Sequence, residues 1–408
     1  IHLIGKNSES HSFRSGEDSM NWNKVITCFT SLFLCLLLTS CENDISEIEN
    51  QNFATAIGVD YRDGEYFVSI QLIGLTSVAK REGGSNPGQS EVYVSETNGR
   101  TFIDAFFKAY HTSQERILWA HVTAIVLSEN ALKQGMDSIF DGLTRYYEFR
   151  PTQWIFGTKE SILDILSTTG FFNQTSLNTI LHSPYSTYEQ SSTIRPVKLN
   201  QFAREFFDPG RTTYIPSISI DDQQWKKNNK KETKLRIDGA FFLDHQKYKG
   251  YFPYEKLTGL RWLAPETKRA SLLLPDEKKP EFIAVLEDQL VKVHPEKQGN
   301  TIRFSVLYTA NAIVSNRMKN NTVNVEHMEE FIKKGIISEV RELYQLGLEH
   351  DIDFLNLEHE LFRKYHYDWK KLDDHETLLH EDSLKSIEAH ITIEHSGSFK
   401  NRKISIKE

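Results

Sequence analysis

An uncharged apolar run near the N-terminus sets the first constraint on this chain. Residues 25–38 are 14 consecutive residues without a charge, and a short segment with one lysine, 21–24, precedes them. This length matches the apolar part of a secretory signal and is too short to span a bilayer as a helix. The sequence therefore predicts export, with Met20 as the true start and residues 20–40 as a signal peptide. Residues 1–19 are polar and unpatterned, and we expect them to be an upstream extension foreign to the native protein.

The apolar run ends at Leu38, Thr39, Ser40 and Cys41. Small residues at 39 and 40 fit the narrow pocket of a signal peptidase, and the thiol of Cys41 can accept diacylglycerol. The arrangement resembles the lipobox of bacterial lipoproteins. That resemblance implies cleavage before Cys41, diacylglycerol and an N-acyl lipid on this residue, and anchoring at the outer face of a membrane. The alternative is an uncleaved membrane anchor that contains a cysteine by chance.

Cysteine usage and charge narrow the class of protein further. The chain has three cysteines, and two of them, Cys28 and Cys35, lie within the predicted signal. A mature chain with one thiol has no internal disulfide, so its stability must come from burial. The net charge of −8 is spread along the sequence, which argues against nucleic acid as the main partner. At 408 residues the chain is expected to form more than one domain.

Strand-like and helical segments alternate along the predicted mature chain. Two hairpins are indicated, by residues 53–75 around an Asp-Gly turn and by residues 239–252. Helical spacing is clear in residues 100–111 and, over about six turns, in the helix that begins at Asn324. We therefore predict an α+β fold of several domains, with mixed β-sheets flanked by helices and a long C-terminal helix packed on a sheet.

Shifts in composition suggest where the domains begin and end. The predicted parts are an N-terminal α/β domain, a charged linker, a small middle β lobe and a C-terminal α/β domain, at residues 41–222, 223–234, 235–278 and 279–398. The linker contains a cluster of lysines, at Lys226, Lys227, Lys230, Lys231 and Lys234. Such a cluster is most often a solvated linker. The alternative is contact with anionic lipid headgroups.

No motif in the sequence indicates catalysis or a metal site. His375 and His380 flank a Glu-Thr-Leu-Leu segment, but zinc ligands on one helical face are four residues apart, and five residues separate them by about 140°. His350, Asp351 and Asp353 are better explained as a helix end followed by a turn. A P-loop, a Gly-x-Ser-x-Gly elbow and a Gly-x-Gly-x-x-Gly loop are all absent from the sequence. We therefore predict that the protein is not an enzyme, has no metal and uses no cofactor beyond the lipid.

Several segments, in order along the chain, resemble the Ger(x)C family, the lipoprotein C subunits of spore germinant receptors. After the lipobox, they are residues 56–60 (AIGVD), 120–129 (AHVTAIVLSE), 148–151 (EFRP), 258–263 (TGLRWL), 351–354 (DIDF), 362–365 (FRKY) and Trp369. The resemblance extends over nearly all of the predicted mature chain.

The resemblance implies a non-enzymatic subunit with three mixed α/β domains on the inner membrane of the spore. It implies two integral-membrane partners, an A subunit and a transporter-like B subunit, in a complex that responds to small nutrients and starts germination. Since no ligand-binding chemistry stands out, we expect a scaffold for the extracytoplasmic parts of that complex. The alternative function is a substrate-binding lipoprotein of a nutrient importer, which shares the signal and the tether but needs two similar lobes around a cleft.

Overall fold

The computed structural model describes residues 51–74, 91–145, 150–275, 278–299, 301–317, 325–371 and 379–395. These residues belong to one compact unit that begins at Gln51. Within it, the strands form a ten-stranded sheet, a four-stranded sheet and a two-stranded ribbon. The predicted α+β class, with mixed sheets flanked by helices, is confirmed.

The ten-stranded sheet is parallel at its centre and antiparallel toward both edges. Its order is β12-β11-β8-β6-β5-β1-β2-β3, with β4 on β1 and β7 on β6. The strands are β1 (Asn52–Arg62), β2 (Glu65–Ile73), β3 (Val92–Gly99), β4 (Ile117–Leu118), β5 (Ala124–Ser128), β6 (Trp154–Thr158), β7 (Val197–Lys198), β8 (Thr213–Asp221), β11 (Lys234–Asp244) and β12 (Lys247–Pro253). β1, β5, β6 and β8 pair in parallel. Every residue of β5 is buried, as expected for a strand covered on both faces.

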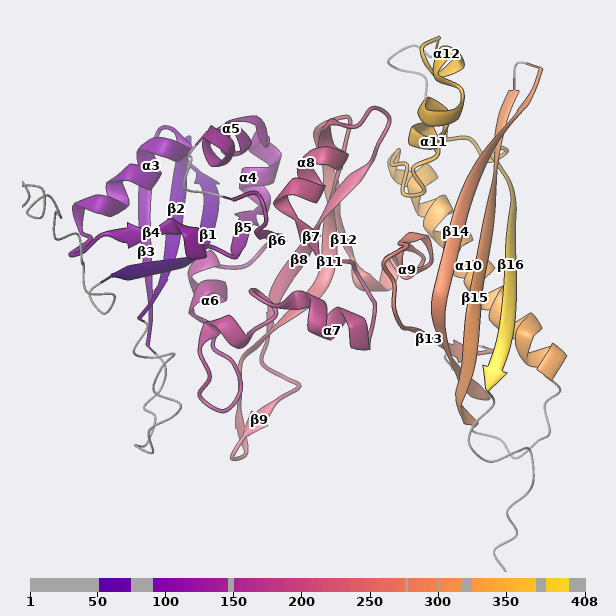
Figure 1. Cartoon of the computed structure of the whole chain (residues 1–408), viewed down its shortest axis with the longest axis horizontal. Helices are drawn as coiled ribbons and strands as arrows, with labels where there is room; N and C mark the ends of the chain where they lie inside the picture. The colour runs from indigo at the N-terminus through magenta and orange to yellow at the C-terminus, as the bar shows by residue number, and fades with distance from the viewer. Residues whose placement is uncertain are drawn as a thin grey trace, which may run out of the picture. The chain divides into compact units, whose positions relative to one another are not determined.

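Helices cover both faces of this sheet (Figure 1). The helices on one face are α3 (Phe102–Lys108), α4 (Glu129–Gln134), α5 (Asp137–Arg145) and α8 (Leu199–Phe207). α6 (Ile162–Ser167) packs on the opposite face, and α7 (Pro184–Gln190) follows it in the chain. Each of α3, α4 and α6 is preceded by a Ser or Thr N-cap. The side chain of this residue accepts a hydrogen bond from a backbone N–H in the first turn of the helix.

The four-stranded sheet packs against the long C-terminal helix, as the sequence predicted. Its order is β13-β14-β15-β16, and its strands are β13 (Ala270–Leu274), β14 (Phe282–Gln298), β15 (Thr301–Arg317) and β16 (Leu384–His395). α10 (Val325–His350) buries a stripe of apolar residues, among them Ile332, Ile336 and Val340, in the core beneath this sheet. The short helices α9 (Leu260–Leu263), α11 (Leu357–Lys364) and α12 (His366–Trp369) complete this part of the chain. β16 closes the sheet at one edge.

Residues 117–127 form two short strands, although their apolar composition by itself suits one long strand. A 3-10 turn, Trp119–His121, separates β4 from β5. Trp119 is the reason, because its side chain is buried in the core and its indole nitrogen donates to the Tyr110 hydroxyl at 2.7 Å. A continuous strand would present that ring in the alternating pattern of a sheet instead.

The chain between the two sheets is organised differently from the predicted linker and middle lobe. β8 pairs with β11 in an antiparallel ladder, so residues on both sides of segment 223–234 belong to one sheet. Residues 235–278 are divided between the two sheets, because β11 and β12 extend the large sheet whereas α9 and β13 pack in the core of the small one. The lysine-rich segment itself forms the ribbon of β9 (Lys226–Lys227) and β10 (Lys230–Lys231).

Candidate functional site

Buried charged residues lie where α8 and the edge of the large sheet meet the C-terminal part of the chain. Glu205 projects from α8 and is only 2% exposed. Its carboxylate accepts a hydrogen bond from the Arg195 guanidinium at 2.9 Å and one from the Thr213 hydroxyl at 3.1 Å. The Arg211 guanidinium lies 3.5 Å away. A buried carboxylate with three donors is compensated, which is the condition for burying a charge at acceptable cost.

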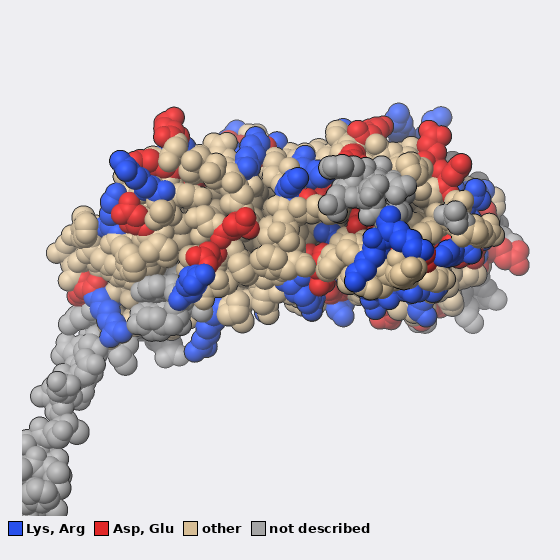
Figure 2. Space-filling view, turned by 90° about the horizontal axis from the view of Figure 1, so that it is seen from above, with Lys and Arg blue, Asp and Glu red and all other residues tan. Residues whose placement is uncertain are grey.

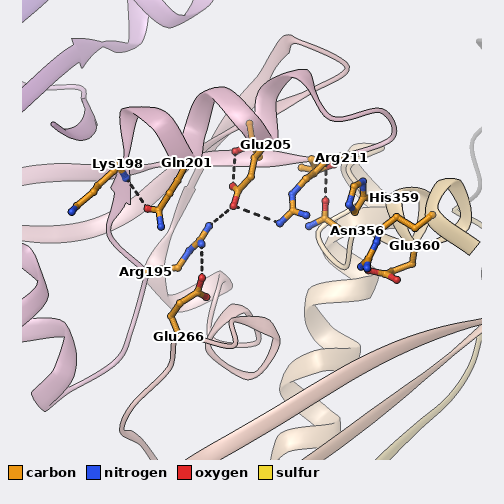
Figure 3. A network of polar contacts seen from close by, with 12 residues as sticks. Arg195, Lys198, Gln201, Glu205, Arg211, Glu266, Asn356, His359 and Glu360 are labelled. Carbon is orange, nitrogen blue, oxygen red and sulfur yellow. Dashed lines mark hydrogen bonds and ion pairs between the residues drawn. The ribbon is translucent and has the colours of Figure 1, made fainter. Parts of the chain in front are cut away.

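Arg195 extends this network across to the segment that leads into the small sheet. Its second terminal nitrogen donates to Glu266 at 2.9 Å, so one guanidinium bridges a carboxylate from α8 and a carboxylate from residues that follow α9 (Figure 3). Its guanidinium carbon lies 5.9 Å from the centre of the Tyr214 ring. Charge-assisted hydrogen bonds of this kind fix geometry as well as contribute energy.

A second group of contacts joins the edge of the large sheet, just before β8 and within the β11–β12 hairpin, to the connection between α10 and α11. Asn356 accepts a hydrogen bond from the backbone N–H of Thr212 at 2.9 Å. Lys249 donates to the carbonyl oxygen of Asp351 at 3.0 Å. The Phe354 ring packs edge-on against Phe242, with centroids 4.7 Å apart. Polar and aromatic contacts therefore connect the same two segments.

Two titratable groups in this second group have displaced pKa values. Hydrogen bonds from His245 to Asp244 and to Glu358 raise the pKa of His245 to about 10. Burial raises the pKa of Asp353 to about 7, although the backbone N–H of Glu358 donates to its carboxyl at 2.8 Å. His245 is therefore a cation across the neutral range, whereas Asp353 is close to half-protonated there.

A third contact holds α9 against the long helix. Arg261 donates twice to the Glu339 carboxylate, at 2.7 and 2.9 Å, and the Trp262 indole donates to it at 2.6 Å. Both Arg261 and Trp262 are buried. The backbone of Gly259 passes so close to α10 that an added Cβ would lie 2.5 Å from the carbonyl oxygen of Glu339.

A cavity of about 170 Å³ opens among these groups. Its charged lining residues are Arg195, Arg204, Glu205, Arg211 and Glu266, and its apolar ones include Phe242, Leu260, Leu263 and Phe354. Arg195 pairs with Glu205 and Glu266, and Arg211 pairs with Glu205, which favours a structural role for these four charges. One carboxylate oxygen of Glu266 and the Nε of Arg211 are buried without a hydrogen-bond partner among the described residues. Within the described residues there is no group of three His, Cys, Asp or Glu side chains that could hold a metal.

The structure gives the sequence-predicted residues simple roles where it describes them. The ring of His350 packs edge-on against Phe252, Asp351 pairs with Lys249, and Asp353 accepts the N–H that starts α11, so these three form a helix end and a turn. The predicted lipobox, Leu38 to Cys41, and His375 lie outside the described residues. None of the helices in the described ranges is long and apolar enough to cross a bilayer.

The buried network of Arg195, Glu205 and Glu266 was not predicted from the sequence. A chain with 56 acidic residues offers too many carboxylates for any pair to stand out. One signal was present, because Glu205 falls on the apolar stripe of α8 together with Leu199 and Phe202. A carboxylate on the buried face of an amphipathic helix requires a buried cation as partner.

Comparison with known proteins identifies the class. A family model described as "Spore germination protein N-terminal domain" matches residues 44–220. A second, described as "Spore germination B3/GerAC like, C-terminal", matches residues 237–397. Together they cover most of the chain, which therefore belongs to the GerAC-like family of spore germination proteins. The family resemblance inferred from the sequence motifs is confirmed.

Individual relatives agree with this family. The chain is 26% identical to the putative spore germination protein YfkR of Bacillus subtilis over 323 residues, 79% of this chain and 76% of that protein. It is 23% identical to spore germination protein KC of the same organism over 374 residues, 86% of this chain and 90% of that protein. The crystal structure of the GerBC protein is similar with a TM-score of 0.46 and 13% identity, covering 83% of this chain and 96% of that one.

Two of the segments that carry the family resemblance lie at the contacts described above, and a third lies at the centre of the large sheet. Residues 258–263 contain Gly259, Arg261 and Trp262, which hold α9 on α10. Residues 351–354 face the β11–β12 hairpin. Residues 120–129 supply β5 and the Ser128 cap of α4. The family motifs therefore coincide with residues that fix how segments distant in sequence pack together.

Proposed function

We propose that the protein is the C subunit of a nutrient germinant receptor and acts with integral-membrane A and B subunits to trigger spore germination. The match of two spore-germination family models to residues 44–220 and 237–397 carries this proposal. The similarity to spore germination protein KC over 86% of the chain supports it.

We place the protein on the extracytoplasmic face of the inner spore membrane, held by diacylglycerol and an N-acyl lipid on Cys41. The basis is the sequence alone, in which an uncharged run leads to Leu38, Thr39, Ser40 and Cys41.

The role that we propose is structural, as a non-enzymatic scaffold for the extracytoplasmic parts of the receptor. The buried pair Arg195 and Glu205 supports this structural role. Arg195 donates to Glu205 and Glu266, and Glu205 also accepts a hydrogen bond from Thr213. A catalytic or ligand-binding charge would be expected to face solvent or a substrate with part of its bonding capacity free. Such a network instead makes the contact between the two sheets rigid.

A substrate-binding lipoprotein of an importer remains the alternative function. It would need two similar lobes around a cleft, whereas the described strands form one sheet of ten and another of four. Stoichiometric co-purification with a transporter ATPase would favour that alternative over the receptor.

The experiment is nutrient-triggered release of dipicolinic acid from spores that lack this gene, complemented with wild-type protein or with Cys41→Ala. We expect a germination defect specific to certain nutrients, rescued by the wild-type protein and not by Cys41→Ala. Cys35→Ala is the matched control, since this cysteine lies in the same segment but within the predicted signal. Rescue by Cys41→Ala would refute the need for the anchor, and normal germination of the deletion strain with every nutrient would favour the importer over the receptor.

A further inference from the structure

The ribbon formed by β9 and β10 is the most exposed part of the large-sheet region. The two strands are joined by Asn228 and Asn229, both in the left-handed conformation that a two-residue hairpin turn requires. The ribbon projects from the end of the sheet beside the loop that follows α6 (Figure 1). Residues 222–231 are all exposed, so the ribbon contributes little to either core.

The positive charge of the ribbon is largely uncompensated. Lys227 lies opposite Lys230 and Lys226 lies opposite Lys231, and like charges directly opposite each other destabilise a strand pair. Lys231 pairs with Asp222 at 3.3 Å. For the other three lysines, the described part of the chain offers no ion pair, and Lys227 instead donates to the amide oxygen of Asn173 at 2.9 Å. Two of the four lysines, Lys226 and Lys230, therefore have no polar partner among the described residues that would explain their position.

Exposed aromatic rings lie next to these lysines. Trp225, immediately before β9, is 45% exposed, and Phe171 and Phe172 in the neighbouring loop are 37% and 92% exposed. The rings of Phe171 and Trp225 are in edge-on contact at 4.9 Å. Phe172 adopts φ +55°, a conformation that a bulky residue rarely takes, and this turns its ring into solvent. We call Phe171, Phe172, Trp225 and the four lysines of β9 and β10 the basic tip.

The basic tip differs from other parts of the described surface. On the face in Figure 2, Lys and Arg side chains lie among Asp and Glu side chains. Another exposed aromatic, Tyr367, also has a lysine beside it, with the Lys371 ammonium 4.3 Å from its ring. That lysine, however, lies 3.8 Å from the Asp368 carboxylate. The basic tip combines three rings with three lysines that have no such neighbour within the described ranges.

We propose that the basic tip docks on the surface of an anionic lipid bilayer. Aromatic rings beside cations favour the interface between headgroups and acyl chains, where the ring enters the apolar layer and the ammonium groups meet phosphates. A negative membrane surface attracts lysines close to it. The contact does not depend on lipid at Cys41. It would give the tethered protein a fixed orientation on its membrane, which a flexible anchor alone does not provide.

Vesicle co-sedimentation of residues 51–408 tests the proposal, because this part forms a compact unit without the signal and Cys41. We expect binding to phosphatidylcholine vesicles that contain phosphatidylglycerol, and little to phosphatidylcholine alone. Each lysine at a negative surface strengthens partitioning about fivefold, so Lys226→Gln, Lys227→Gln and Lys230→Gln together should weaken it about 100-fold. Raising the salt concentration toward about 1 M should have a similar effect, because it shortens the screening length to about 3 Å.

A second variant separates the rings from the charge. Phe172→Ser with Trp225→Ser should reduce binding. Brominated lipid should quench the fluorescence of Trp225, because only a ring within the bilayer meets the bromine. The Trp225→Phe variant identifies that part of the fluorescence, since it lacks it. Tyr367→Ser with Lys371→Gln is the matched control and should bind like the wild type. Absence of binding, equal binding by all variants, or recruitment that is indifferent to lipid charge would overturn the proposal. Absence of binding would assign the basic tip to an acidic protein partner instead.

Discussion

Neutralising Glu205 tests whether the buried network holds the two parts of the chain together. Glu205→Gln keeps the size of the side chain but removes the charge that faces Arg195 at 2.9 Å and Arg211 at 3.5 Å. Breaking a buried pair typically costs 3–5 kcal/mol, because the partner is left buried without compensation. Arg195 keeps Glu266, whose side chain is partly exposed. We therefore expect a loss at the lower end, about 3 kcal/mol.

Urea unfolding of residues 51–408, followed by tryptophan emission, measures this loss. With a denaturant slope of about 3 kcal/mol/M, the midpoint should fall by about 1 M. Arg195→Met and the double variant Arg195→Met/Glu205→Gln complete a cycle. The double variant should cost less than the two single changes together, by at least about 1 kcal/mol, because each single change leaves a charge that the other removes.

The control is Glu360→Gln, which removes a carboxylate that pairs with Arg363 at 3.0 Å on the surface of α11. Exposed pairs contribute about 0–1 kcal/mol, so its midpoint should hardly move. Two results would refute the reasoning. One is a Glu205→Gln midpoint like that of the control, and the other is strict additivity in the cycle.

Three further predictions concern packing, protonation and capping. Gly259→Ala should cost about 1–3 kcal/mol and lower the melting temperature, since its Cβ would meet the Glu339 carbonyl oxygen at 2.5 Å; an unchanged melting temperature would contradict this. The raised pKa of Asp353, about 7, makes the folded state bind more protons than the unfolded state between about pH 4 and 7, so stability falls as pH rises through that window. Asp353→Asn should flatten this dependence in urea titrations, and an unaltered slope would count against it. Ser128→Ala should cost about 1 kcal/mol and speed amide exchange in α4, because it removes the acceptor for the Ala131 N–H; exchange at the wild-type rate would exclude that capping role.

The elements with strong periodicity could be predicted from the sequence. The spacing of Ile332, Ile336 and Val340 fits a helix with one apolar face, so the sequence predicted both the long helix and its packing on a sheet. The β1–β2 hairpin followed from alternating apolar residues around Asp63 and Gly64, both with positive φ in the structure. Local pattern was sufficient in these places because local and tertiary preferences agree.

The candidate site could not be predicted in the same way. Arg195, Glu205 and Glu266 become partners only when α8 and the segment after α9 are brought together, and nothing in their local sequence states that pairing. Residues 171–222 are rich in Ser, Thr, Asn, Gln and Pro, yet tertiary contacts form α7, α8 and β8 there. The lysines of β9 and β10 suggested a linker, because strands this short lack the apolar alternation that predicts a strand.

The boundary between the two family models does not coincide with a boundary in the structure. The first model ends at residue 220 and the second begins at residue 237. β8 contains the end of the first, and it pairs with β11 from Lys234↔Asp221 to Leu243↔Thr213. Cutting the chain between them would leave β8 as an open edge with unpaired backbone groups, which promotes aggregation. The segments matched by the two family models therefore share the ten-stranded sheet through β8 and β11, and the buried network around Glu205 reinforces a connection that the β8–β11 ladder already makes.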